Sequence, residues 1–258
     1  MLCFDRWFAF VTHDIVKYLL AAGGLYFVVY GLLGVRLAAR RLQSHRADLK
    51  QIRREVGWSL VSAVIFGTMS MLLVIVPGEL GWNQLYFDMG AWGWSYALFS
   101  LLLMIVAHDA YFYWTHRLLH HPVLLKYIHR THHLSRTPTP WTAYALDPGE
   151  AVVQAAFPAL FALLVPVHPL TVLIWSVHMI VRNVLGHAGF ELMPPGLARS
   201  RWLGWLTTAT HHDLHHATFQ WNFGLYFTWW DRLMGTEHPE YLARFDAATG
   251  TSDQKMRV

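Results

Sequence analysis

The chain has 258 residues, of which 55% are hydrophobic and only 14% charged, and its formal net charge is +4. Soluble domains usually carry about 25% charged residues, so this composition excludes an ordinary soluble protein and indicates an integral membrane protein. The single cysteine, Cys3, excludes a disulfide framework and any metal site built on several thiolates. Catalytic metal ligands must therefore be histidines or carboxylates.

Hydropathy predicts three long spans in the first half of the chain. The first covers residues 15–35, with Lys17 near its outer end, where a long side chain can reach the lipid headgroups. The second covers residues 57–76 and the third residues 91–120. At about 1.5 Å per residue the third exceeds the hydrocarbon thickness, so its histidine-bearing end should project beyond the membrane. We expect no cleaved signal peptide, because charged residues precede the first apolar run and no cleavage pattern follows it.

Two further apolar segments, residues 150–165 and 170–185, form either two full spans or a hairpin that enters the membrane and returns. The predicted fold is an all-α integral membrane helical bundle with about four transmembrane helices and a cytoplasmic, histidine-rich di-metal cap. We expect a single domain made of two N-terminal spans with a basic loop (1–90), a histidine-box catalytic region (91–240) and a polar tail (241–258).

The segment between the first two spans is strongly basic. Residues 36–54 contain seven Lys or Arg and one acid, Asp48. Such a cluster is typical of a nucleic-acid patch or of a cytoplasmic loop that follows the positive-inside rule. Apolar runs on both sides favour the loop, so we predict no nucleic-acid partner. The histidine site then faces the cytoplasm from an inner or endoplasmic-reticulum-type membrane.

Many of the chain's histidines recur at helical spacing. One pair is spaced i, i+4, and two boxes of the form HxxHH are spaced i, i+3, i+4, which places each set on one helix face. Nine imidazoles are too many for one ion with an open position, so they predict two metal ions and favour iron–oxygen chemistry over zinc hydrolysis. The predicted metal ligands are His116, His120, His129, His132, His133, His187, His212, His215 and His216.

Two other histidines are ambiguous. His108 lies two turns before His116 and faces either the site or the bundle. His211 is four residues before His215. This pair competes with the pair His212 and His216, which has the same i, i+4 spacing, for the same ligand positions.

Carboxylates near the boxes are candidates for orienting the rings. A metal-bound histidine normally donates its other N–H to a carboxylate or a carbonyl. Asp109 is two turns before His116, Glu191 is one turn beyond His187, and Asp213 lies inside the last box. Ordinary surface or capping acids are the alternative interpretation. No catalytic residue beyond the metal ligands can be identified from the sequence.

The histidine boxes and their flanks occur together in a fixed order. The chain thereby resembles the fatty acid hydroxylase/sterol desaturase superfamily of membrane di-iron enzymes, and its flanks are most similar to sterol C5-desaturases (lathosterol oxidases). The resemblance covers roughly residues 108–238. Its motifs are YFYWTHRLLHH (111–121), HRTHH (129–133), PTPW (138–141), GHAGFE (186–191), THHDLHH (210–216) and NFGLYFTWWDRLMGTEH (222–238).

The resemblance implies a chemistry and a set of partners. Two Fe ions would use O2 to hydroxylate or desaturate an apolar lipid (a sterol, carotenoid, hopanoid, fatty-acyl lipid or sphingolipid) at an unactivated C–H bond. Zinc is an alternative metal in the purified protein. Electrons from NAD(P)H would come through a separate carrier, cytochrome b5 or a ferredoxin-type protein with its reductase, because the chain has no nucleotide-binding motif.

A histidine-rich membrane protein could have two other functions. A histidine-rich membrane metal transporter would need ionisable residues along a path through the spans, and the predicted spans are nearly free of them. A bis-His haem electron carrier would need isolated histidines on two helices, whereas this sequence has triplets on single helix faces. Both functions are therefore less favoured than lipid oxidation.

Overall fold

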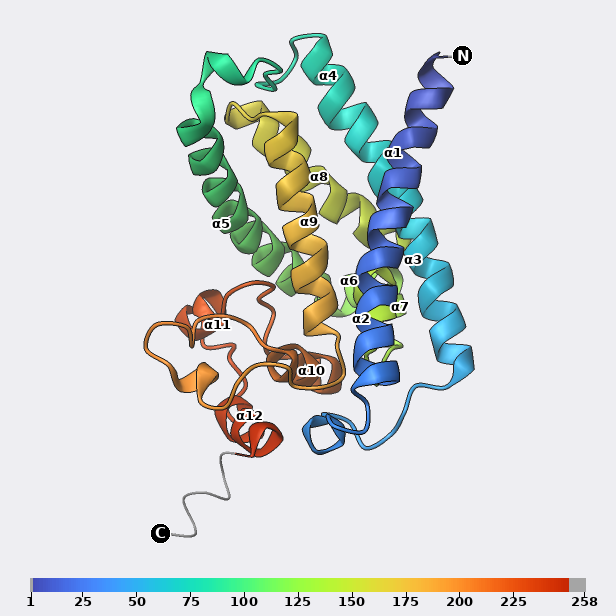
Figure 1. Cartoon of the computed structure of the whole chain (residues 1–258), viewed down its shortest axis with the longest axis vertical. Helices are drawn as coiled ribbons and strands as arrows, with labels where there is room; N and C mark the ends of the chain where they lie inside the picture. Colours follow the sequence, from blue (N-terminus) through green and yellow to red (C-terminus); the bar gives the residue numbers. More distant parts are fainter. Residues whose placement is uncertain (1, 251–258) are drawn as a thin grey trace.

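The computed structural model describes residues 2–250, with side chains from residue 4, as a helical bundle with a cap of short helices at one end (Figure 1). The long helical runs are α1 (Leu2–Tyr18) with η1 (Leu19–Gly23), α2 (Gly24–Tyr26) and η2 (Phe27–Leu32), then α3 (Leu49–Met69) with η4 (Ser70–Ile75) and α4 (Val76–Glu79), then α5 (Gly93–Leu119), α8 (Pro148–Leu164) and α9 (Pro169–Gly186). The short elements are η3 (Ala38–Arg40), η5 (Met89–Ala91), α6 (Pro122–Leu124), η6 (Leu125–His129), α7 (Arg130–His133), η7 (Pro140–Tyr144), η8 (Leu197–Arg199), α10 (Ala209–Thr218), α11 (Trp229–Leu233) and α12 (Tyr241–Thr249).

The long helices confirm the predicted membrane bundle. Among the described residues, four helices are long and apolar enough to cross a membrane, namely Phe4–Leu32, Leu49–Glu79, Gly93–Leu119 and Pro169–Gly186. Large apolar side chains such as Phe27, Leu72 and Phe99 are exposed on the outside of the bundle, where lipid rather than water would surround them. The protein is an integral membrane protein.

Helices α8 and α9 form a hairpin. Its tip pairs with the segment before α5, since Gln84 N donates to Ala162 O (2.7 Å) and Val167 N donates to Gln84 O (3.1 Å). This tip lies at the end of the bundle opposite α10 (Figure 1). The hairpin therefore runs from the cap to the far end of the bundle and back.

The first span begins earlier than predicted, at Phe4 rather than at residue 15. As a result Lys17 lies inside the span and forms an ion pair with Asp14, and only 10% and 6% of these two side chains are exposed. The prediction that Lys17 reaches the headgroups is wrong, because Asp14 lies one turn away on the same helix face and supplies the opposite charge.

A close helix crossing fixes the orientation of α1. A Cβ placed on Gly67 of α3 would lie 2.7 Å from the Cα of Val11, so only glycine allows the two backbones to approach this closely. Val11, Asp14 and Tyr18 are buried at i, i+3 and i+7, which is one face of α1. The crossing thus holds Asp14 toward the inside of the bundle.

The cap lies beside the basic loop that joins the first two spans. Leu42 N donates to Gly189 O (3.1 Å) and Glu191 N donates to Arg40 O (2.9 Å), which ties this loop to the chain just after α9. The basic loop and the predicted histidine site are therefore at the same end of the bundle.

The C-terminal segment differs from the predicted polar tail 241–258. Residues 241–249 form α12, in which Tyr241 and Phe245 are buried against Ala198. The apolar spacing i, i+4 explains this helix. Residues 251–258 of the predicted tail lie outside the described residues.

Candidate metal centre

The nine predicted ligands converge in two adjacent groups at the cap end of the bundle. Within each group the ligand nitrogens lie within 4.8 Å of one another. The five-histidine group consists of His116, His120, His129, His133 and His215, and the four-histidine group consists of His132, His187, His212 and His216. All of these side chains are buried except that of His120, which is partly buried.

In the five-histidine group the ring nitrogens surround a small space. His133 Nε2 lies 3.1 Å from both His120 Nε2 and His129 Nε2, and 3.2 Å from His215 Nε2. Metal–nitrogen bonds of about 2.1 Å place opposite ligands on one ion about 4.2 Å apart. The nitrogens are therefore spaced as ligands of a single ion are.

The four-histidine group centres on His187, which directly follows α9. His187 Nε2 lies 2.9 Å from His212 Nε2, 3.2 Å from His216 Nε2 and 3.4 Å from His132 Nε2. The two groups share a border, because the ring centroids of the neighbouring residues His132 and His133 are only 5.5 Å apart. Two ions held by these groups would therefore be close neighbours.

Each HxxHH box supplies ligands to both groups. In box 129–133 the first and last histidines belong to the five-histidine group, and His132 belongs to the four-histidine group. Box 212–216 is divided in the reverse sense, with His215 in the five-histidine group. Residues i and i+4 are separated by about 40° around a helix and i+3 lies on the other side of i. The face predicted for each box therefore straddles the two groups.

Main-chain carbonyls orient three of the rings. A carbonyl can only accept, so each Nδ1 carries the proton and each Nε2 keeps a lone pair for a metal. The bonds run from His116 Nδ1 to Phe223 O (2.9 Å), from His215 Nδ1 to Trp221 O (2.7 Å) and from His187 Nδ1 to Asn183 O (2.8 Å). The segment after α10 thus positions ligands through its backbone.

Two carboxylates at the start of α8 also contact the histidine boxes, and neither was predicted. Glu150 Oε2 lies 2.7 Å from His129 Nδ1. Asp147 accepts hydrogen bonds from Thr131 N (2.8 Å) and Thr131 Oγ1 (2.5 Å), which holds the first turn of α7. The available sequence signal was the presence of two acids at the head of an otherwise apolar helix.

The predicted partner Asp109 has a different role. It accepts hydrogen bonds from Tyr226 N (2.9 Å), Phe227 N (3.2 Å) and the indole N–H of Trp229 (2.7 Å). Seven residues along a helix correspond to about 10 Å, which separates Asp109 from the ring of His116. Asp109 therefore holds the segment after α10 against α5 and does not orient a ring.

Glu191 and Asp213 also bind groups other than the nine rings. Glu191 accepts from Thr210 N (2.9 Å) and Thr210 Oγ1 (2.6 Å), and so holds the start of α10. It is not one helical turn beyond His187, because α9 ends at Gly186. Asp213 accepts from Gln43 Nε2 (2.8 Å), because its position on α10 turns it away from the two groups and toward the basic loop.

The two ambiguous histidines lie outside both groups. His108 Nδ1 is 2.8 Å from the hydroxyl of Tyr226. His211 Nε2 is 3.5 Å from Asp231 Oδ2, on the side of α10 that faces Tyr241. The pair at 212 and 216, rather than the pair at 211 and 215, is therefore the one directed into a single group.

Burial keeps the rings neutral. Desolvation lowers the pKa of His187 to about 4 and the pKa of His120 to about 2. Burial, and to a lesser extent the neighbouring imidazoles, also lower the pKa values of five other rings well below the usual 6.5. These rings are His132, His133, His212, His215 and His216. Neutral imidazole is the form that binds metal, so at pH 7 few protons need to leave.

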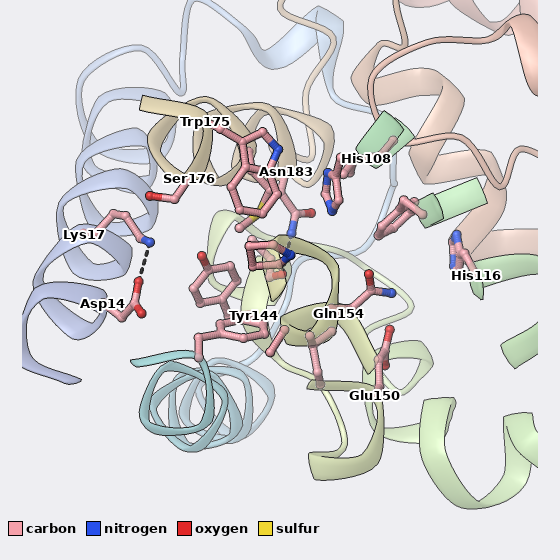
Figure 2. A pocket seen from close by; sticks show the side chains of 18 of the residues that line it. Asp14, Lys17, His108, His116, Tyr144, Glu150, Gln154, Trp175, Ser176 and Asn183 are labelled. Atoms are coloured by element: carbon pink, nitrogen blue, oxygen red, sulfur yellow. Dashed lines mark hydrogen bonds and ion pairs between the residues drawn. The ribbon is translucent and has the colours of Figure 1, made fainter. Parts of the chain in front are cut away.

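A mostly apolar cavity of about 790 Å³ runs from both groups into the membrane bundle (Figure 2). His116 lines it from the five-histidine group, and His132, His187 and His212 line it from the four-histidine group. Its walls include Phe66, Phe112, Leu146, Trp175 and Met179.

Comparison with known proteins identifies the family. The model of the family described as "Fatty acid hydroxylase" matches residues 101–236, which contain all nine ligands. The chain belongs to the fatty acid hydroxylase family. It is 34% identical over 199 residues to the Delta(7)-sterol 5(6)-desaturase ERG3B of Gibberella zeae, covering 76% of this chain and 59% of that protein.

Other relatives of this fatty acid hydroxylase family member also carry sterol-related names. It is 31% identical over 204 residues to lathosterol oxidase of Rattus norvegicus, covering 77% of this chain and 66% of that protein. It is 24% identical over 235 residues to methylsterol monooxygenase 1 of the same organism, covering 90% of this chain and 76% of that protein. The chain thus spans 59% to 66% of the length of the first two relatives. No solved structure matches the chain.

The side chains of this family member fit two metal ions. The ligands are neutral imidazoles without thiolates, a set that suits iron, zinc and copper. The Nε2 of His116 is buried and has no hydrogen-bond partner among the described residues, as expected for a nitrogen reserved for a metal. The open end of the site faces an apolar cavity rather than water.

Proposed function

We propose that this protein is a membrane-bound, non-haem di-iron oxidoreductase that uses O2 to hydroxylate or desaturate a sterol-like lipid at an unactivated C–H bond. The observation that carries the proposal is the apolar cavity, because His116 of one group and His132 of the other both line its inner end. An apolar lipid that entered from the bundle would thus meet both metal positions. The sterol-related names of the relatives support a ring lipid over an acyl chain.

In this proposal the nine histidines hold two Fe ions, which supply the activation of O2 needed to remove hydrogen from an unactivated C–H bond. The chain itself supplies ligand orientation and exclusion of water. The carbonyls of Trp221 and Phe223 keep the ring nitrogens of His215 and His116 directed at the metal. Aromatic walls such as Phe112 keep the reacting carbon in a dry environment.

We further propose that the electron donor is a separate acidic protein such as cytochrome b5 or a ferredoxin. A surface hollow of about 730 Å³ is lined by Lys126, Arg130 and Arg136, and also by His133 of the five-histidine group. Basic side chains around a path to a metal ligand favour an acidic partner. The basic loop at the same end of the bundle supports a cytoplasmic orientation of this face.

The test uses the purified full-length protein loaded with iron and supplied with a reduced ferredoxin and a panel of sterols and other lipids. We expect about two metal ions per chain, in line with the two groups of ligands. We also expect lipid-dependent O2 uptake and a product that has gained one oxygen or lost two hydrogens. Protein treated with a chelator is the control. Iron-loaded protein that consumes no O2 with any lipid of the panel contradicts the proposal.

A further inference from the structure

The ion pair between Asp14 and Lys17 lies inside the first membrane span, which runs from Phe4 to Leu32. Both side chains are nearly buried, at 6% and 10% exposed. Ionisable groups at this depth are costly and mark functional sites in membrane proteins. The metal centre does not use this pair, which lines the same cavity at the end away from His116 (Figure 2).

A third polar group shares this end of the cavity. The hydroxyl of Tyr144 is buried, with 1% of the residue exposed, and has no hydrogen-bond partner among the described residues. It points toward the side of the cavity where Asp14 and Lys17 lie (Figure 2), and burial, followed by the nearby Asp14 carboxylate, raises its pKa well above the usual value. A buried hydroxyl without a partner costs free energy unless a ligand supplies that partner.

A second cavity of about 920 Å³ meets the first at the ion pair. Both cavities are lined by Asp14 and Lys17. The second continues between apolar side chains such as Phe10, Val74 and Leu173, in the half of the bundle away from α10. The ion pair is thus a charged position, beside Ser70 and Ser176, on a mostly apolar route with space for hydrocarbon on both sides.

We propose that Asp14, Lys17 and Tyr144 form a binding site for the hydroxyl group of an otherwise apolar lipid, and that this site determines which C–H bond lies beside the histidines. This inference rests on the proposed function. The charges of Asp14 and Lys17 compensate each other, so the site suits a neutral group. A hydroxyl can donate to the Asp14 carboxylate and at the same time accept from the Tyr144 O–H.

The same chemistry disfavours acidic lipids. A carboxylate or phosphate would bring a second negative charge beside Asp14 in a place with little water to screen it. The ligand class is therefore a lipid alcohol, such as a sterol with one hydroxyl, rather than a free fatty acid or a phospholipid.

The experiment measures binding rather than turnover. The full-length protein, with its metal as purified and without reductant, is titrated with cholestanol and with the methyl ether of cholestanol, which cannot donate a hydrogen bond. We expect the wild-type protein to bind the alcohol about tenfold more tightly than the ether, which corresponds to a difference in binding free energy of about 1.4 kcal/mol. This comparison requires no variant. Equal affinities for the alcohol and the ether overturn the proposal.

Variants show which side chains cause the preference for the alcohol over the ether. The double variant Asp14→Leu/Lys17→Met removes both charges together and leaves neither charge unpaired, and we expect its alcohol-to-ether preference to fall to about one. Tyr144→Phe removes a donor from which the alcohol and the ether oxygen can both accept, so it should weaken the binding of both about threefold and leave the preference nearly unchanged. Ser100→Ala is the matched control, because Ser100 is also buried in a span but lines neither cavity. A preference that persists unchanged in the double variant overturns the proposal.

The outcomes separate this site from the catalytic function. An alcohol preference that the double variant abolishes supports the site even in a protein that shows no O2-dependent turnover. Lipid oxidation by a wild-type protein that binds the alcohol and the ether equally overturns the site while leaving the proposed oxidation intact.

Discussion

Glu150 Oε2 lies 2.7 Å from His129 Nδ1, and both side chains are almost completely buried. The contact joins the first turn of α8 to the five-histidine group. A carboxylate beside this nitrogen limits the orientations open to the imidazole and leaves Nε2, which lies 3.1 Å from His133 Nε2, for the metal. The head of α8 therefore belongs to the metal centre as well as to the membrane bundle.

Replacing Glu150 tests this role. We expect Glu150→Ala to weaken metal binding by about 10–100-fold, as is usual when a carboxylate that orients a metal ligand is lost. Glu150→Gln should have a smaller effect, because the amide keeps the size of the side chain and an oxygen beside His129 Nδ1. Metal content after dialysis against a graded series of chelator concentrations measures the change. Glu240→Gln, an exposed carboxylate on the surface, is the control. Unchanged retention in Glu150→Ala would show that His129 is oriented by other contacts.

Asp231 supports the backbone that orients two other ligands. It accepts from Phe223 N (2.9 Å), Gly224 N (2.8 Å) and Thr236 Oγ1 (2.8 Å). We expect Asp231→Ala to lower the free energy of unfolding by about 1–3 kcal/mol, because buried N–H groups lose their acceptor.

The same variant should also release metal more readily, because Phe223 O accepts from His116 Nδ1. Thermal unfolding in detergent together with metal analysis measures both effects, again with Glu240→Gln as the control. A variant that retains wild-type metal content and unfolding temperature would argue against this support.

Helical spacing was sufficient to predict which nine histidines come together but not their surroundings. The positions i, i+3 and i+4 place three rings near one face of a helix, and this local rule needs no tertiary information. The partners of the rings depend on contacts across the fold. Phe223 O is 107 residues from His116, and it acts through a main-chain atom that leaves no side-chain signal in the sequence.

Hydropathy predicted the four spans but misplaced the start of the first. Lys17 was predicted to reach the headgroups from the outer end of the first span, because a charge in a span is costly when it is considered alone. In the folded chain Asp14 and Lys17 compensate each other, and the glycine crossing at Gly67 turns their side of α1 inward. A window of single-residue hydropathies does not register such a pair.

The metal-free protein should lose stability as the pH falls from about 6.5 to about 4. Burial holds the pKa of His187 at about 4 in the folded chain, whereas an unfolded imidazole has a pKa of about 6.5. Between these values the unfolded chain binds more protons, so the free energy of unfolding decreases as the pH falls. The other lowered imidazoles at the cap, such as His132 and His215, act in the same direction.

Buried carboxyl groups, among them Asp213 and Asp231 at the cap, oppose this trend. Burial raises the pKa values of Asp213 and Asp231 to about 6, so the folded chain takes up protons there before the unfolded chain does. The imidazoles outnumber these carboxyl groups, so we expect a net loss of stability. Thermal unfolding of chelator-treated protein at about pH 7, 6 and 5 measures it. An unfolding temperature that rises or stays constant over this range would contradict the expected sign.

Adjacent histidines of one box should hold different ions. His132 belongs to the four-histidine group and His133 to the five-histidine group, although their ring centroids are only 5.5 Å apart. We expect His132→Ala and His133→Ala each to abolish turnover and each to retain roughly one ion per chain, because the other group keeps its own ligands. The double variant should retain almost none. Metal analysis of the three proteins measures this, with exposed His121→Ala as the matched control. If His132→Ala loses both ions while His133→Ala loses neither, the two groups do not bind metal independently, and the division of each box between two ions is wrong.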